Sequence, residues 1–469
     1  MKTQMAAPAT FFGGAVRVSG ESVAVTDEKA LATDAMDALA RDAVFGDAAA
    51  KERARWLLWE LGQAVGVRPS SIHELYRARG RGETKGFTVP AINVRGSAYE
   101  TARAIFRTAI AARAGAFILE IARSEIAYTD QRPAEYVAVM LAAAMREGFR
   151  GPLFIQGDHF QVNAKKFAAD PTGEVTAVKQ LAAEAITAGF FNIDVDTSTL
   201  VNISLATLDE QQRANYETAV DIAQVVRSLQ PAGVTISIGA EIGEVGTSNS
   251  TVPELKAFMD GYLRTAQARG LGAMAPLSKI SVQTGTSHGG IVLPDGKIAD
   301  VKLDLKALEA LSKVARDEYG MAGAVQHGAS TLPENAFGHF PRIETAEIHL
   351  ATNFQNILYD HLPDALLANI YAWLRDNAKD ERKAGDTDDQ FYYKTRKKAL
   401  GPFKQQLWDL PAANKAALAA AYDKTFEFLF EQLRVGGTVD VVKRTITAPR
   451  LHHQAPAGAI APDDPDAGE

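Results

Sequence analysis

The chain has 469 residues, of which 46% are hydrophobic and 23% charged, with a formal net charge of −7, nine histidines and no cysteine. This mild acidity gives no electrostatic footprint for nucleic acid or an anionic membrane, and no apolar run approaches the roughly 20 residues of a membrane helix. Without cysteine, any metal must be bound by nitrogen and oxygen, and without a hydrophobic N-terminal stretch we expect a cytoplasmic protein.

The first 70 residues form an extension that precedes the main pattern. Helical periodicity covers about 30–65 and includes Trp56 and Trp59. We interpret residues 1–70 as an N-terminal helical extension that packs on the main domain or on another subunit.

From residue 87 onward, short β-type runs alternate with amphipathic helical patterns such as 99–114 and 134–148. Parallel strands require long crossovers and have nearly continuous hydrophobic sequences. The pattern therefore predicts an α/β fold, a (β/α)₈ TIM barrel. An open doubly wound sheet is the alternative, but it would not bring the ends of strands three, six and seven together so readily. The predicted strands are 87–94, 116–122, 152–158, 191–196, 234–243, 280–285, 323–328 and 346–352.

The C-terminal part of the chain is predicted to be helical. Long helices are expected at 353–376 and 412–433, joined by a charged stretch at 376–389. The barrel with these helices would span 71–435. The remaining tail, 436–469, is expected to be partly disordered, because 454–469 is rich in Ala, Pro, Gly and Asp.

Three histidines follow apolar β-type runs, each in a glycine-rich turn. They are His159, His288 and His327, after the third, sixth and seventh predicted strands. Active sites of such barrels lie at the C-terminal ends of the strands. Three protein ligands leave a coordination position open for substrate, which is typical of a catalytic zinc site. The sequence therefore predicts a metal site at this rim of the barrel.

Acidic residues lie at matching positions of the same rim. Asp158 and Asp196 end the third and fourth strands, and Glu241 lies near the end of the fifth. Adjacent strand residues point to opposite faces, so Asp158 and His159 share a site only if the strand ends there, after Gly157. A single histidine at a strand end is more often structural, and Asp196 could instead cap a helix. The combination favours metal binding.

The glycine-rich turns also indicate a phosphorylated substrate. Gly289, with Gly290, follows the sixth strand, and Gly328 and Ser330 follow the seventh. Glycine turns expose backbone N–H groups that can hold a phosphate, although they also serve tight turns without any ligand.

The ordered set of motifs resembles the class II, metal-dependent fructose-bisphosphate aldolases and their ketose-bisphosphate aldolase relatives, from about residue 71 to 433. The first strand with its asparagine is similar, as are the segments at strands three to seven and one before the final helix. The matching segments are Val-Pro-Ala-Ile-Asn (89–93), Gly-Asp-His (157–159), Val-Asp-Thr-Ser (195–198), Ser-Ile-Gly-Ala-Glu-Ile-Gly (237–243), Gly-Thr-Ser-His-Gly (285–289), His-Gly-Ala-Ser (327–330) and Lys-Lys-Ala-Leu-Gly-Pro (397–402).

The resemblance implies a lyase that reversibly cleaves a phosphorylated ketose such as fructose 1,6-bisphosphate into dihydroxyacetone phosphate and an aldehyde. It also implies Zn²⁺ or another divalent metal, a second position for a metal or monovalent cation, and a homodimer or larger homo-oligomer. The implied roles are proton transfer by Asp158, zinc binding by His159, His288 and His327, the second position at Asp196 and Glu241, and substrate or phosphate binding by Asn93, Gly289, Gly328, Ser330 and Thr352.

The chain departs from the family pattern in three places. The loop 246–251 has no acidic residue, and His349 and Ala351 stand where the family has asparagine and aspartate. In addition, about 70 residues precede the matched region. We therefore interpret His349 as filling a pocket. A different ketose phosphate as substrate, and a non-catalytic or regulatory aldolase-like subunit, remain alternatives.

Two other mechanisms are disfavoured by the sequence. A Schiff-base lysine, as in class I aldolases, would need a lysine in the barrel, and none lies inside a predicted strand. A barrel hydrolase would usually have His-x-His on the first strand, where residues 93–95 offer none.

Overall fold

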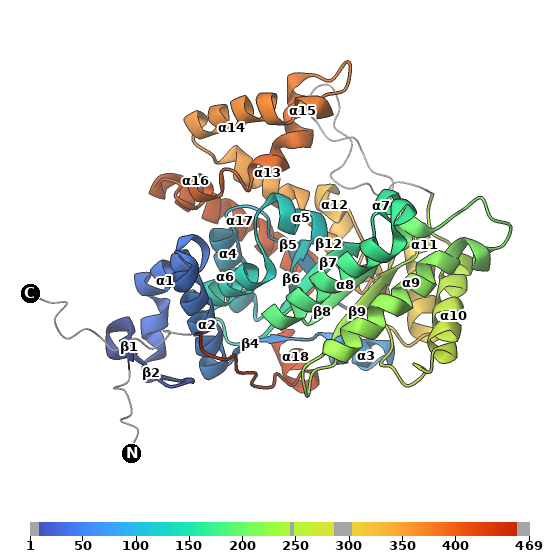
Figure 1. Ribbon diagram of the computed structural model, residues 1–469, viewed down its shortest axis with the longest axis horizontal. Coiled ribbons are helices and arrows are strands. Elements are labelled where there is room, and N and C mark those ends of the chain that lie inside the picture. Colours follow the sequence, from blue (N-terminus) through green and yellow to red (C-terminus); the bar gives the residue numbers. More distant parts are fainter. Residues whose placement is uncertain (1–8, 244–247, 286–302, 457–469) are drawn as a thin grey trace, which may run out of the picture.

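The computed structural model describes residues 9–243, 248–285 and 303–456. Parallel strands close into the predicted eight-stranded barrel, surrounded by helices (Figure 1). Each of the eight predicted runs overlaps a strand of the barrel. The barrel strands are β5 Val89–Asn93, β6 Ile118–Ala122, β7 Gly151–Gln161, β8 Asn192–Asp196, β9 Ser237–Glu241, β10 Lys279–Val282, β11 Ala324–Gln326 and β12 Glu347–Leu350.

Closure of the barrel is direct, because the last strand pairs with the first. β12 is parallel to β5, with Glu347 opposite Val89 and Leu350 opposite Ile92. Every residue of β5, β6, β8 and β9 is buried. One face of each strand packs on the helices and the other fills the barrel interior, which explains the continuous hydrophobic runs.

Helices cover the outside of the barrel and lie between successive strands. The predicted helices at 99–114 and 134–148 correspond to α4 and α6. The helices from the first to the last barrel strand are α4 Ala98–Ala112, α5 Arg123–Tyr128, α6 Pro133–Arg146, α7 Ala164–Ala169, α8 Pro171–Ala188, α9 Leu208–Leu229, α10 Val252–Ala268, α11 Leu305–Asp317 and α12 Glu334–Phe337.

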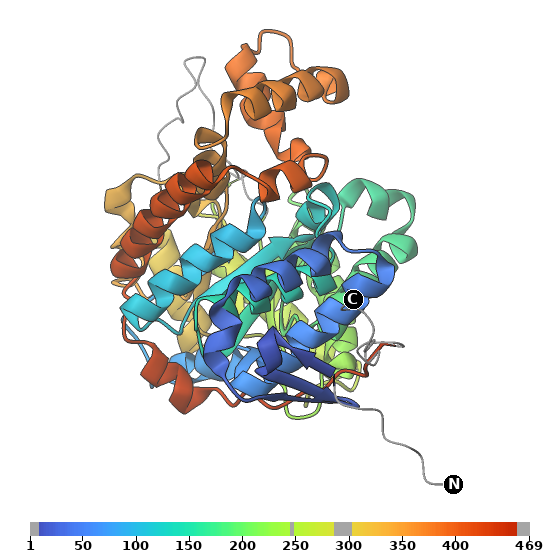
Figure 2. The same cartoon turned by 90° about the vertical axis from the view of Figure 1, so that its left-hand side faces the viewer.

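The N-terminal extension is partly helical, as predicted, but it also contains strands. β1 (Ala9–Phe11), β2 (Val16–Ser19) and β3 (Ser22–Val25) form a small antiparallel sheet that was not predicted. α1 (Asp34–Phe45) and α2 (Ala48–Val65) follow and lie against the side of the barrel (Figure 2).

A further short strand follows the extension at the foot of the barrel. β4 (Val67–Ser70) pairs with the first residues of β7. From Gln156 onward, β7 pairs instead with β8.

The two ends of the barrel are covered by different segments (Figure 1). α3 (His73–Gly80) lies at the foot, where the Tyr76 hydroxyl donates to Glu347 inside the barrel. The opposite end, where the strands finish, carries α13 Thr352–Asp360, α14 Asp364–Asn377, α15 Asp388–Thr395 and α16 Lys404–Trp408. The next helix, α17 Ala412–Gln432, packs along α4 on the outside of the barrel.

The predicted helix at 353–376 is interrupted. α13 ends at Asp360 and α14 begins at Asp364, directly after Pro363. Proline lacks the N–H that a helix interior requires and disfavours helical geometry in the residue before it, so one continuous helix cannot form. The second predicted helix, 412–433, matches α17.

The described part of the C-terminal tail returns to the N-terminal extension. After α18 (Val439–Thr445), the indole N–H groups of Trp56 and Trp59 donate to the backbone carbonyls of His453 and Leu451. The Trp59 and His453 rings stack with centroids 3.9 Å apart. The stretch from 457 on, where disorder was expected, lies outside the described residues. None of the described helices is both long and apolar enough to span a membrane.

Candidate metal centre

Side chains from four barrel strands meet at the rim where the strands end. β7 provides Asp158 and His159, β8 provides Asp196, and β9 provides Glu241. His327 directly follows β11. The predicted ligand His288 and the predicted phosphate-binding Gly289 lie outside the described residues.

A bulge in β7 lets two adjacent residues reach the same cluster. The strand does not end at Asp158, as we expected, but continues to Gln161. Its pairing with β8 shifts register between Gly157 and Phe160, and His159 adopts a left-handed conformation with φ 41°. A bulge re-aims side chains, and here it brings His159 Nε2 to 3.8 Å from Asp158 Oδ1.

The other nitrogen of His159 faces two carboxylates. Its Nδ1 lies 2.8 Å from Asp196 Oδ2 and 3.3 Å from Glu241 Oε2. Asp196 is fixed in turn by the backbone N–H and the hydroxyl of Ser198. An imidazole that donates one N–H to a carboxylate presents its second nitrogen to a metal, which is the usual arrangement at metal sites.

His327 lies beside His159, and the ring centroids are 4.2 Å apart. Its Nε2 is 2.9 Å from the Ser281 hydroxyl, so Nδ1 is the nitrogen suited to metal binding. Asp158, His159 and His327 each offer one donor atom, and these atoms lie within 4.8 Å of one another. His159, Asp196 and Glu241 form a second group of this kind.

A buried polar network continues below the rim, and the sequence did not predict it. His349 on β12 lies 3.0 Å from Asp158 Oδ1, 3.2 Å from Glu120 Oε2 and 2.7 Å from Glu347 Oε1. We interpreted His349 as filling a pocket. It is instead part of the site, with its ring 4.1 Å from that of His327. Alternation along β12 places Glu347 and His349 on the same face, a signal that was available in the sequence.

A lysine lies inside the barrel, contrary to our expectation. Lys279 is the first residue of β10, one position before the predicted strand, and it is fully buried. Its Nζ donates to Asp194 Oδ2 at 3.0 Å and also to Glu347. Burial would lower the pKa of Lys279, but these two carboxylates raise it above its usual value. A lysine held as ammonium is not a nucleophile, so the Schiff-base mechanism is still disfavoured.

The carboxylates of the site have strongly perturbed affinities for protons. Burial, followed by the charge of Asp196, raises the pKa of Glu241 to about 8. Burial and the charge of Asp158 raise the pKa of Glu120 to about 7. Burial would also raise the pKa of Glu347, but Lys279 holds it at about 2.

The histidines respond to the same charges. Burial would lower the pKa of His159, but Asp158 and Glu241 raise it well above the usual value. Glu120 and Asp158 do the same for His349.

The donor set fits a divalent cation. The clustered carboxylates outnumber the lysine and the two imidazoles that pair with them. Within the described part of the chain, the buried oxygens Glu120 Oε1 and Asp194 Oδ1 have no hydrogen-bond partner. Nitrogen and carboxylate donors suit zinc and related first-row metals, and a cation would offset the excess negative charge of this interior.

Three of the predicted phosphate-binding residues lie near each other. Gly328 is left-handed, with φ 65°, and begins the short turn that contains Ser330. The Ser330 hydroxyl accepts a hydrogen bond from the backbone N–H of Asn353 at 3.4 Å. This contact joins the loop after β11 to the N-terminus of α13, where Thr352 is the first residue.

Asn93, predicted to bind substrate, is held in a separate polar group. Its amide N–H donates to Glu125 Oε2 at 2.5 Å, and its oxygen accepts from Arg95 at 3.0 Å. Arg95 also pairs with Glu125 at 2.6 Å. The described contacts of Asn93 are therefore with protein groups, and its role toward substrate stays a prediction.

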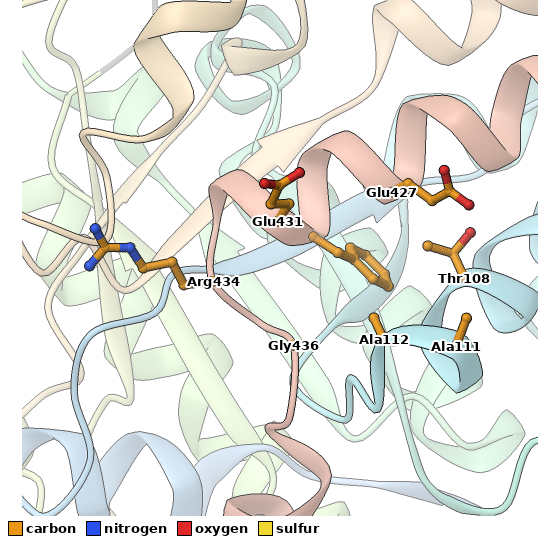
Figure 3. A pocket seen from close by; sticks show the side chains of 8 residues that line it. Thr108, Ala111, Ala112, Glu427, Glu431, Arg434 and Gly436 are labelled. Atoms are coloured by element: carbon orange, nitrogen blue, oxygen red, sulfur yellow. The ribbon is translucent and has the colours of Figure 1, made fainter.

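A surface cavity of about 320 Å³ lies between α4 and α17 (Figure 3). It is lined by Ala112, at the end of α4, and by Glu427, Glu431 and Arg434. The C-terminal end of α4 leads into the start of β6, so this cavity is at the opposite end of the barrel from the histidines. It belongs to the outer helical layer.

A parallel barrel with histidines and carboxylates at its carboxyl rim has the donor groups that a metal-binding barrel protein needs. Sequence comparison identifies the family: the model of class II fructose-bisphosphate aldolase matches residues 77–406, and the chain belongs to this family. The family is metal-dependent. A comparison with curated proteins gives no match.

The chain is similar to several solved structures at low sequence identity, and the first of those below shares its fold. A probable tagatose 6-phosphate kinase from Sinorhizobium meliloti is 17% identical, with a TM-score of 0.53 over 78% of this chain and 95% of that one. A fructose-bisphosphate aldolase from Campylobacter jejuni is 16% identical (TM-score 0.47, 79% and 97% covered). A fructuronate-tagaturonate epimerase from Cohnella laeviribosi is 12% identical (TM-score 0.48, 84% and 86% covered).

Proposed function

We propose that the chain is a zinc-dependent, or other divalent-metal-dependent, lyase that reversibly cleaves a phosphorylated ketose into a dihydroxyacetone-phosphate-like ketone and an aldehyde. The observation that carries this proposal is the convergence of His159, His327 and Asp158, with donor atoms within 4.8 Å of one another, in a chain of the class II aldolase family.

The proposed metal site uses the donor atoms that face the rim. His159 through Nε2, His327 through Nδ1 and the predicted ligand His288 would hold the cation. Glu241 and Asp196, beside His159 Nδ1, would orient that imidazole or hold an alternative cation position. When bound, the cation would act as a Lewis acid toward the ketone oxygen of the substrate.

Asp158 is the proposed proton-transfer residue. During cleavage it would take the proton of the hydroxyl group on the carbon that becomes the aldehyde. The carbon–carbon bond then breaks, and its electron pair stays on the carbon next to the ketone, which takes up a proton from solvent to give the ketone product. In condensation Asp158 would return the proton to the aldehyde oxygen. General acid–base help of this kind contributes about 10²- to 10⁴-fold to the rate.

Gly328, Ser330 and Thr352 are proposed to hold a phosphate group of the substrate. The left-handed turn at Gly328 and the N-terminus of α13 are adjacent. Backbone N–H groups in a turn and at a helix N-terminus suit an anion. The predicted homo-oligomer and the identity of the sugar stay predictions.

The first test measures cleavage of a panel of phosphorylated ketoses before and after removal of the metal with a chelator. Treatment with EDTA should abolish cleavage, and Zn²⁺ or Co²⁺ should restore it. Asp158→Ala should keep stoichiometric metal but lose about 10²- to 10⁴-fold in turnover. Asp317→Asn, on the exposed face of α11, is the matched control and should leave turnover unchanged.

Removal of a proposed ligand separates metal binding from proton transfer. His327→Ala should lose metal and activity together, and so should His288→Ala. A purified protein that holds no divalent metal and cleaves none of the sugars would contradict the lyase proposal. That result would favour the non-catalytic aldolase-like subunit.

A further inference from the structure

His349 has carboxylates on both sides of its ring. Nδ1 is 3.0 Å from Asp158 Oδ1 and 3.2 Å from Glu120 Oε2, and Nε2 is 2.7 Å from Glu347 Oε1. A carboxylate oxygen can only accept, so both ring nitrogens act as donors. The His349 side chain is buried, and these contacts fix the plane of its ring.

Glu347, the inner partner of His349, is itself fixed by several donors. It accepts from Gln156 Nε2 at 3.0 Å, from Lys279 and from the Tyr76 hydroxyl. Lys279 is held in turn by Asp194 and by the Gln156 oxygen. A chain of hydrogen bonds therefore leads from the foot of the barrel to Asp158 at the rim.

Asp158 belongs to two donor groups, and this creates a conflict. One group is Asp158, His159 and His327, and the other is Asp158, Glu120 and His349. A carboxylate within reach of a divalent cation can bind it. Once bound to the cation, Asp158 would be a poorer base for a substrate hydroxyl group.

We propose that His349 is a positioning residue: its hydrogen bond to Asp158 keeps that carboxylate out of the coordination shell of the metal and available to substrate. This inference rests on the proposed function. It explains why a histidine serves at this position, because one ring can link Asp158 to the rigidly held Glu347. Partners of groups at metal sites typically change metal affinity or activity by about 10- to 100-fold when they are removed.

The hydrogen bonds made by the two ring nitrogens of His349 can be tested separately. Asparagine at this position places its amide nitrogen near the site of Nδ1, and glutamine places its amide nitrogen near the site of Nε2. His349→Asn should therefore keep the bond to Asp158, whereas His349→Gln should keep the bond to Glu347. Asn is the matched control for Gln.

The experiment measures Co²⁺ binding and the visible absorption spectrum of the Co²⁺-loaded full chain, together with kcat and KM. In His349→Gln, Asp158 should join the metal. Co²⁺ binding should tighten and its spectrum change toward higher coordination, while kcat should fall about 10- to 100-fold with little change in KM. His349→Asn should keep the native spectrum and a kcat within about threefold of native, well short of the 10- to 100-fold loss.

The Asp158→Ala variant keeps the test decisive even if His349→Gln fails to fold. If His349 holds Asp158 off the metal, Asp158→Ala should bind Co²⁺ with native affinity and spectrum. Adding His349→Gln to Asp158→Ala should then change neither. Weakened Co²⁺ binding by Asp158→Ala would overturn the proposal, and so would a native Co²⁺ spectrum in folded His349→Gln.

Failure of the proposed function is distinguishable from failure of this inference. The Co²⁺ measurements require no substrate, so absence of cleavage on every sugar would contradict the lyase proposal but not the positioning result. A native chain that binds no Co²⁺ would overturn both.

Discussion

Single residues at the carboxyl rim were predictable because the ends of barrel strands share one edge. Asp196, Glu241 and His327 follow from strand position, and the structure brings each of them beside His159. The charged interior was harder to predict. Glu120 and Glu347 lie inside hydrophobic runs, where a charged residue gives no sign of its partner. Lys279, which offsets Glu347, is 68 residues away in sequence and lies just before the predicted strand.

Substitution of Lys279 tests its role as a buried counter-ion. Lys279→Met leaves Glu347 and Asp194 without their cation, and breaking such a buried pair costs about 3–5 kcal/mol of unfolding free energy. Urea titration should show this loss. Lys256→Met, which removes an exposed pair with Glu318, should cost less than about 1 kcal/mol.

The same lysine can be tested chemically. Borohydride reduction in the presence of a cleaved ketose should leave Lys279 unmodified, because its amine is held as ammonium. A substrate adduct on Lys279 by peptide mass spectrometry would refute the assignment.

At the scale of elements, all eight strands were predictable and their bounds were not. Parallel strands buried on both faces have continuous hydrophobic sequences, and this signal does not depend on distant contacts. The bulge that extends β7 does depend on them, because it is fixed by pairing with β8. Pro363 is a local signal for the break between α13 and α14, but the helical periodicity on both sides of it obscured this signal.

Gly157 is predicted to be essential for the bulge. A Cβ at this position would come 2.5 Å from the fully buried Phe160 ring, so the ring or the backbone would have to shift. Gly157→Ala should therefore destabilise the fold by about 1–3 kcal/mol and weaken metal binding, since Asp158 and His159 are adjacent. Gly436→Ala, whose Cβ would meet only Ala112 O at 3.5 Å, is the control. Equal stability of the two variants would show that the bulge tolerates a side chain.

At the scale of the whole molecule, the N-terminal extension and the C-terminal tail form one structure on the side of the barrel. The two tryptophans of α2 indicated packing, and the tail proves to be one of their partners. Its docking could not be predicted, because residues 447–453 have no periodic pattern. Protonation also affects the whole interior, because burial raises the pKa of several of its carboxylates.

The stability of the metal-free protein should fall as pH rises. Folded Glu241 keeps its proton up to about pH 8, whereas its unperturbed pKa is 4.5. Between these values the folded state binds more protons than the unfolded state, so the unfolding free energy decreases with pH. Glu120, with a pKa of about 7, acts in the same direction.

Thermal unfolding in chelator across this pH window checks the expectation, and added Zn²⁺ should restore stability most at the alkaline end. Glu241→Gln should have a shallower dependence on pH. An unfolding free energy of the metal-free protein that increases as pH rises would contradict this prediction.

The central claim is that imidazoles from separate strands hold one cation at the rim of the barrel. X-ray absorption at the zinc edge of stoichiometrically loaded protein tests it most directly. We predict one zinc per chain with imidazole nitrogens at about 2.0–2.1 Å, and loss of that scattering in His327→Ala. Zinc without imidazole neighbours, or a native zinc site that survives His327→Ala, would contradict the account.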